Sequence, residues 1–300
     1  MTQPPDLVTR FEEERGRLRA VAYRMLGSLS EAEDAVQEGW LRLQRADTDE
    51  VRNLSGWLTT VVGRICLDML RTRTARREEP FEHEALGPAE TRVPDPVIRP
   101  ADPVHEAELA DSVGLALLVV LDTLAPAERL AFVLHDMFAV PFEELAPIVE
   151  RTPAATRQMA SRARRRVQGA TAPRDTPLAR QREVVRAWLA ATRAGDFEAL
   201  LELLDPDVLL RVDAGSGTAS GLLRGSLAVA KQAAFYGKLA QAAYPAFVGD
   251  GLGIVQAPRG QVVSVLAFTF RDGKVVGVDI IADPPRLAAL GIGWVGPGGE

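Results

Sequence analysis

The sequence has very little cysteine and histidine. Cys66 is the only cysteine in 300 residues, which excludes a disulfide framework and a zinc-binding cysteine cluster. It follows an apolar helical pattern, so we expect a small buried hydrophobic side chain there. The histidines, His83, His105 and His135, stand apart from one another, and we expect neither a metal site nor a cofactor.

Long apolar runs are also absent. No stretch of 18 uncharged apolar residues occurs, and the acidic N-terminus lacks the apolar core of a signal peptide. We therefore expect a cytoplasmic protein without a membrane partner. Lysine is absent before Lys231, and GC-rich coding is a sufficient reason for that bias.

The composition is that of ordinary globular domains. A chain of 300 residues with 47% hydrophobic content can bury two or three cores. The net charge of −6 argues against a protein coated in nucleic acid, but acidic runs elsewhere leave room for local basic surfaces.

A basic helical pair lies near the middle of the chain. Residues 142–149 carry an apolar stripe at helical spacing, and a second helical run follows a short break. At the break, Thr152 suits an N-cap and Pro153 suits the first helical position. From Arg151 to Ala170 there are arginines but no Asp or Glu. This layout is typical of a DNA-binding helix-turn-helix, although a solvated cationic helix end is the alternative.

The helical blocks resemble the two domains of extracytoplasmic-function sigma factors. The segments AEDAVQEGWLRL and WLTTVVGRICLDMLR are similar to the sigma-2 domain, and the stretch LDTLAPAERLAFVLHDMFAVPFEELAPIVERTPAATRQMASRARRRV is similar to a complete sigma-4 domain. The resemblance implies two all-α domains, sigma-2 at residues 6–77 and sigma-4 at residues 106–170. Residues 78–105 between them are rich in Pro and Glu, which predicts a flexible linker.

The resemblance implies three binding surfaces. In the family, the second helix of sigma-2 docks on the clamp helices of the largest subunit of core RNA polymerase. That surface falls here on Asp34, Gln37, Glu38 and Leu41. The next helix and its entry loop open and hold the −10 promoter element, which falls on Asn53, Trp57, Thr60, Arg64, Asp68 and Arg71. The recognition helix of sigma-4 reads the −35 promoter element, which falls on Thr156, Arg157, Gln158, Ser161, Arg162 and Arg165.

These residue types suit their roles. Promoter opening needs cations along the strand and a stacking surface for a flipped base, which the arginines between positions 64 and 77 and Trp57 offer. Trp57 as a plain core anchor is the alternative. Arg can bond guanine and Gln can bond adenine, each pair being worth about 1–3 kcal/mol of discrimination. The family usually has Asn where Gly63 and Arg64 stand.

Residues 176–300 differ in character from the helical blocks. A helix over 178–194 precedes the strand patterns VLLRVD, QVVSVLAFTFR and KVVGVDIIAD, the last two joined by an Asp-Gly hairpin signal. The pattern predicts an α+β domain. The stretch AWLAATRAGDFEALLELLDPDVLLRVDAG resembles the SnoaL-like branch of the nuclear transport factor 2 fold, a cone with an internal pocket. Such a pocket would take a small-molecule ligand, and the candidates to line it are Asp207, Asp213, Tyr236 and Asp279.

A subgroup of these sigma factors carries just such an extension. Its Asp-Gly-rich loop corresponds to residues 213–217 here, and its Asn-Pro-Asp-Lys-Leu segment corresponds to residues 282–287. SnoaL relatives move protons with a pocket Asp or His. No histidine lies in this domain, and solvent-facing positions explain Asp213 and Asp279 equally well, so we expect a regulatory domain and not an enzyme.

The sequence therefore predicts a bacterial sigma factor that directs RNA polymerase to promoters and is modulated in cis by its last domain. Two alternatives stay open. One is a ligand-responsive helix-turn-helix regulator that binds DNA without recruiting polymerase. The other is a small-molecule isomerase or hydrolase that carries a nucleic-acid module.

Overall fold

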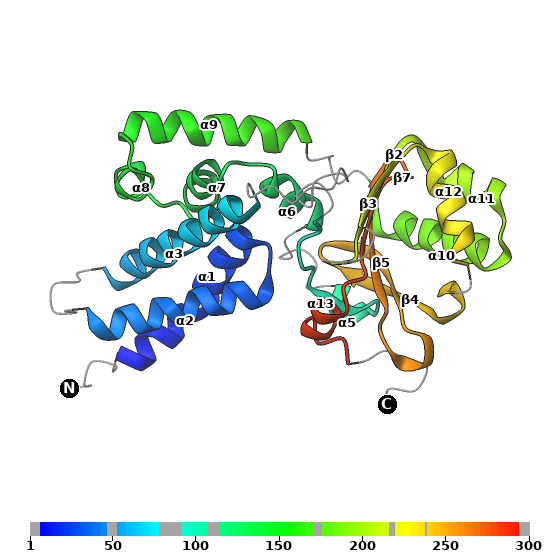
Figure 1. Ribbon diagram of the computed structural model, residues 1–300, viewed down its shortest axis with the longest axis horizontal. Helices are drawn as coiled ribbons and strands as arrows, with labels where there is room; N and C mark the ends of the chain where they lie inside the picture. The colour runs from blue at the N-terminus through cyan, green and yellow to red at the C-terminus, as the bar shows by residue number, and fades with distance from the viewer. Residues whose placement is uncertain are drawn as a thin grey trace. The chain divides into compact units, whose positions relative to one another are not determined.

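A computed structural model describes residues 7–46, 53–77, 92–106, 114–170, 176–215, 220–237 and 239–293. The chain divides into two compact units (Figure 1). The first comprises residues 1–82 and 118–171, and the second comprises residues 83–117 and 172–300. Residues 78–91 of the predicted linker and residues 216 and 217 of the predicted loop lie outside the described residues. None of the helices in the described part of the chain has the length and apolar character needed to cross a membrane.

The first unit is built from helices. They are α1 (Leu7–Leu26), α2 (Leu29–Arg45), α3 (Leu54–Arg77), α7 (Pro126–Phe132), the π-helix η3 (Val133–Met137), α8 (Phe142–Val149) and α9 (Pro153–Ala170), and α6 (Leu115–Asp122) precedes α7. Helix α1 packs on α2 and α3 through apolar side chains at helical spacing, including the fully buried Leu18 and Met25. The two predicted all-α regions are confirmed.

Helices α8 and α9 form the predicted helix-turn-helix. Helix α8 ends at Glu150, whose φ of 56° is left-handed. The Thr152 hydroxyl then accepts a hydrogen bond from the Ala155 N–H at 3.2 Å, which pairs a donor that would otherwise be unsatisfied at the start of α9. Ala160 and Ala163 are fully buried, so the small side chains of α9 face the body of the unit.

The second unit contains a mixed sheet. Its strands are β1 (Ile98–Pro100), β2 (Leu204–Asp213), β3 (Gly221–Arg224), β4 (Ala243–Val248), β5 (Gly251–Gln256), β6 (Ser264–Arg271) and β7 (Lys274–Ile281). Their order is β1-β4-β5-β6-β7-β2-β3, and only β2 and β7 pair in parallel. The β6–β7 hairpin turns at Asp272 and Gly273, which both have positive φ, as the Asp-Gly signal predicts.

Helices cover one face of this sheet. They are α10 (Leu178–Ala194), α11 (Phe197–Leu203) and α12 (Ser226–Phe235), seen beside the sheet in Figure 1. Trp188 of α10 packs edge-on against Phe268 of β6 with ring centroids 5.2 Å apart, and Phe247 of β4 is fully buried in the same core. The short helices α5 (Pro103–Glu106) and α13 (Pro284–Ala289) lie outside that core. The predicted α+β domain is confirmed.

One part of the predicted linker has a defined structure. Residues 98–100 form strand β1, which pairs antiparallel with β4, with Ile98 opposite Val248, and takes the edge position that β4 would otherwise have. Just before it, the Val97 carbonyl accepts a hydrogen bond from the Gly249 N–H at 2.8 Å. Composition alone indicated a chain without fixed partners, but an exposed sheet edge offers unpaired N–H and C=O groups to any extended segment.

Candidate nucleic-acid interface

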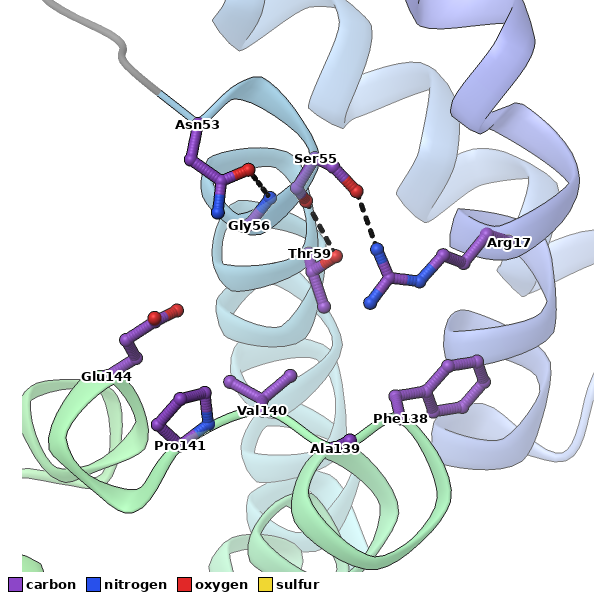
Figure 2. Close-up of a pocket in the computed structure, with 10 residues that line it drawn as sticks. All are labelled: Arg17, Asn53, Ser55, Gly56, Thr59, Phe138, Ala139, Val140, Pro141 and Glu144. Atoms are coloured by element: carbon purple, nitrogen blue, oxygen red, sulfur yellow. Dashed lines mark hydrogen bonds between the residues drawn. The ribbon is translucent and has the colours of Figure 1, made fainter.

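The residues predicted for the −10 element share one side of α3. Those that are exposed are Asn53, Arg64, Asp68 and Arg71, and those that are half-buried are Trp57 and Thr60. Asn53 stands just before the helix and its Oδ1 accepts a hydrogen bond from the Gly56 N–H at 3.0 Å, so this side chain also caps α3 (Figure 2). Trp57 is half-buried, so it is neither a fully buried core anchor nor a fully exposed ring.

The cations of α3 are not equivalent. Arg73 pairs with Glu31 and also donates to the Leu26 carbonyl at 3.3 Å, so it ties α3 to the neighbouring helices. Arg71 lies 3.9 Å from Asp68, but both side chains are about half exposed and such a pair contributes little. Arg64 and Arg71 are therefore two cations of this helix that point to solvent.

The residues predicted for polymerase docking lie on the outer side of α2. Asp34, Gln37 and Leu41 are exposed at helical spacing, and Leu41 is 37% exposed despite its apolar side chain. Glu38 accepts a hydrogen bond from the Nε of Arg42 at 2.9 Å. The side chain of Asp34 has no ion pair within the described ranges. Of the two carboxylates among the four predicted residues, it is the more accessible to a partner.

The recognition helix α9 presents most of its predicted readers to solvent. The exposed ones are Arg157, Gln158, Arg162 and Arg165, and Ser161 is half-buried. The structure contradicts the predicted DNA contact of Thr156. Its side chain is fully buried, and its hydroxyl donates to the Thr152 carbonyl at 3.0 Å. It shares the inward side of α9 with Ala160 and Ala163, so it cannot face a groove of DNA in this arrangement.

Other arginines of α9 are bound to the body of the helix-turn-helix domain. The Nε of Arg164 donates to Asp136 Oδ1 at 2.6 Å, and Arg166 reaches Glu128 at 3.2 Å. The run of arginines therefore contains side chains directed to solvent and also partly exposed side chains that form ion pairs with α7 and η3. Sequence spacing did not separate these two groups, because their acidic partners lie 28 and 38 residues away.

The two helical regions contact each other within the first unit. Buried Arg129 of α7 donates to the Met25 carbonyl at the end of α1 at 2.8 Å and to Asp122 at 2.6 Å. A Cβ added at Gly63 of α3 would lie 2.9 Å from Leu134 Cδ1, so any larger residue there would displace the Leu134 side chain. Gly63, a departure from the usual family pattern, thus faces the second helical region and not solvent.

A cavity marks the edge of this contact. It has a volume of about 170 Å³ and lies between the start of α3 and the turn that follows η3 (Figure 2). Asn53 and Thr59 line it from α3, and Phe138 and Val140 line it from the turn. The surface predicted for the −10 element therefore begins beside the second helical region.

In the second unit, Arg286 joins the linker segment to the α+β domain. Its Nε donates to Asp95 at 2.8 Å, its Nη1 donates to Asp213 at 2.5 Å, and its Nη2 donates to the Val93 carbonyl. The Val93 N–H donates to Asp213 at 2.9 Å. Burial by itself lowers the pKa of Arg286, but Asp95 and Asp213 raise it above the ordinary value. We call the set Val93, Asp95, Asp213 and Arg286 the linker clamp.

The loop and the segment that the family resemblance singles out meet at the linker clamp. Asp213 begins the Asp-Gly loop, and Arg286 belongs to the segment 282–287. A Cβ added at Gly215 would lie 2.7 Å from the Asp283 Cγ, so the two segments touch directly. Asp95 and Arg286 were not among the predicted site residues, since their pairing joins positions 191 residues apart.

The four residues predicted for a pocket have different surroundings. Asp207 is exposed and Tyr236 is 47% exposed. Asp213 belongs to the linker clamp. Asp279 is buried against Arg211 of β2 at 2.5 Å, where burial raises its pKa and Arg211 opposes that rise. Both strand carboxylates are thus held by arginines and do not point to open solvent.

Comparison with known proteins gives consistent matches along the chain. Residues 10–76 match the model for sigma-70 region 2, and residues 114–167 match the model for sigma-70, region 4. The chain is 38% identical over 302 residues to the ECF RNA polymerase sigma factor SigJ of Mycobacterium tuberculosis, covering 93% of each protein. It is 32% identical to the probable ECF sigma factor SigI of the same species, covering 97% of this chain and 98% of that one. The crystal structure of SigJ matches with a TM-score of 0.70 and 35% identity, covering 94% of this chain and 98% of that one.

The division of the α9 arginines makes a testable prediction. Replacing an outward side chain, Arg162→Ala, should reduce the salt dependence of DNA binding by about 0.9 in the slope of log K against log salt concentration for each lost phosphate contact. Fluorescence anisotropy of the full chain, bound to core polymerase and a duplex containing its −35 element, measures this slope at several salt concentrations.

Arg164→Ala is the matched control, because it removes the same charge from the same helix. Its guanidinium is held by Asp136, so the slope should stay at the wild-type value. Equal losses of slope for Arg162→Ala and Arg164→Ala would contradict the division into outward and bound arginines.

Proposed function

Because this chain belongs to the extracytoplasmic-function sigma factors of the sigma-70 family, it directs RNA polymerase to promoters, and we propose that its C-terminal α+β domain sets that activity in cis by holding the linker. The family is not enzymatic, and the chemistry of RNA synthesis belongs to the polymerase. The observation that carries the proposal is the linker clamp, in which Arg286 of the last domain binds Asp95 of the linker.

Several further contacts of the linker segment support this role. Strand β1 extends the sheet of the α+β domain, and Glu106, which directly follows the linker, accepts a hydrogen bond from Arg182 of α10 at 2.8 Å. The segment from Val93 to Glu106 is thus attached at its beginning, middle and end. A linker held in this way cannot extend freely between the two helical regions that it joins.

Promoter geometry explains why the state of the linker matters. The −10 and −35 elements are centred about 25 base pairs apart, which is roughly 85 Å of B-DNA. In the first unit α3 and α9 both pack on α7, and packed helix axes lie 8–10 Å apart, so their axes are within about 20 Å. From the middle of α3 to the middle of α9, the path adds at most half of each helix length, about 18 and 14 Å, and the length of α7, about 10 Å, so the two reading surfaces lie well short of the distance that the DNA requires. Binding both elements therefore requires the helical regions to separate.

One substitution should shift the equilibrium between a closed form, in which the two helical regions pack together, and an open form, in which they are separated. Gly63→Ala should favour the open form, because its methyl group would crowd Leu134 at 2.9 Å. The same change favours the helical state of α3 by about 0.5–1 kcal/mol, so the sigma-2 region itself is not weakened. Energy transfer between dyes on Gln44→Cys and Gln168→Cys, both at exposed positions, should fall relative to the parent chain.

Two features make that measurement specific. Cys66 is fully buried and burial raises the pKa of its thiol, so it should not take the dyes. Gly16→Ala is the control, since a Cβ at Gly16 of α1 meets nothing within 4 Å. Identical energy transfer in the Gly63→Ala and Gly16→Ala chains would count against an opening step. Adding core polymerase to the parent chain should also lower the energy transfer, and an unchanged value would count against the step as well.

The linker clamp makes a prediction about transcription. Arg286→Ala should release the linker and raise promoter-dependent transcription by about fivefold or more, the lower end of a typical allosteric coupling. Asp95→Asn should act in the same direction while leaving every residue of the α+β domain in place. Truncation after Thr176 should also change the yield. Transcription reconstituted from core polymerase and the mapped promoter measures all three.

Arg180→Ala serves as the control for this experiment. Arg180 pairs with Glu183 on the same exposed face of α10 and makes no contact with the linker clamp. If Arg286→Ala and Asp95→Asn give the same level of transcription as Arg180→Ala, modulation through the linker is rejected. Promoter-dependent transcription by these chains would still support the sigma-factor function.

The outer side of α2 gives a prediction about polymerase binding. We propose that it docks on the clamp helices of the largest subunit. Asp34→Lys should weaken capture of core polymerase by at least about tenfold, because a like charge at such an interface costs several kcal/mol. Asp68→Lys, on the exposed side of α3, is the control. Capture that is unaffected by Asp34→Lys would exclude this surface.

A further inference from the structure

Three side chains from three elements form a stack beside the recognition helix. The ring of His135 in η3 lies on the ring of Phe142 in α8, with centroids 3.7 Å apart and planes 27° apart. The guanidinium carbon of Arg157 in α9 lies 5.2 Å from the centroid of the same Phe142 ring. Phe142 is 8% exposed, whereas Arg157 is exposed, so the stack leads from the core to the surface predicted to face DNA.

The base of the stack is held by the backbone. His135 Nδ1 lies 2.9 Å from the Val140 carbonyl, and because a carbonyl only accepts, this nitrogen carries the proton. Ala139 adopts a left-handed φ of 56°, and the turn that it forms returns the Val140 N–H to the Leu134 carbonyl at 2.9 Å. The π-helical turn η3 and this strained residue thus hold the imidazole beneath Phe142.

The consequence for Arg157 follows from the chemistry of its side chain. A free arginine on a helix surface samples many rotamers, and that freedom is lost when it bonds a base. A guanidinium placed over an aromatic face is attracted to it and is already restricted before DNA arrives. Its planar fork keeps donors available at the edge of the stack, because stacking uses only the face.

We propose that Phe142 and His135 are positioning residues that hold Arg157 in the orientation for base contact in the −35 element. The proposal rests on the −35 role of α9 and adds two residues that do not themselves touch DNA. Phe142 as ordinary core packing is the competing explanation. Core packing alone would change the stability of the domain and its affinity for every sequence alike, whereas positioning changes the preference at one base pair.

The test measures that preference directly. Holoenzyme containing the full chain is bound to the mapped promoter and to each single-base variant of its −35 element. Arg157→Ala should identify the base pair that Arg157 reads. Phe142→Leu and His135→Ala should each reduce discrimination at that same base pair by about two- to fivefold, the range of a partly exposed cation–aromatic contact. His135→Phe should retain most of it, since an aromatic ring can still stack.

The outcomes separate the explanations. Arg164→Ala is the control for loss of a cation from α9, and it should leave the preference unchanged. The proposal would be overturned if the Phe142 and His135 variants lose the same affinity for every single-base variant of the −35 element. It would also be overturned if they change the preference at a base pair other than the one that Arg157 reads. No effect of Arg157→Ala at any base pair would also overturn it, while promoter-dependent transcription would still support the sigma-factor function. Thermal unfolding of each variant shows whether it folds, and the His135 variants remain decisive if Phe142→Leu does not.

Discussion

The position of the linker in the second unit depends on the hydrogen bonds that the guanidinium of Arg286 makes. A guanidinium that is mostly withdrawn from water is costly unless carboxylates and carbonyls surround it, and here Asp95, Asp213 and the Val93 carbonyl do so. Two of these partners belong to the linker and one belongs to β2. The linker therefore supplies two of the three acceptors of this guanidinium, which makes the segment part of the α+β domain as much as a connection between two helical regions.

Buried charge also determines how the first unit is assembled. Arg129 is 4% exposed and reaches from α7 to the last carbonyls of α1, where the helix dipole favours a cation. Gly63 permits close packing beside it. Arg129 and Gly63 both contribute to the contact between the two helical regions, which is the contact that the proposed separation would break.

The strand carboxylates of the α+β domain are paired with arginines. Asp279 is buried and its pKa is raised, which in a pocket would suit a proton-transferring base. Here it faces Arg211 at 2.5 Å, and Asp213 faces Arg286. Both carboxylates hold strands or the linker in place, in agreement with a family that is not enzymatic.

Local pattern determined the helical regions, the helix-turn-helix and the Asp-Gly hairpin of this protein, because spacing, caps and turn residues act over a few positions. The same pattern could not show that Thr156 turns inward or that Arg164 is bound to Asp136, since the side of a helix that is buried depends on its neighbours. Tertiary structure alone decided that residues 98–100 join the sheet and that Arg286 meets Asp95. Those contacts link positions far apart in the chain, and only the packed fold brings their charges and backbone groups within hydrogen-bonding distance.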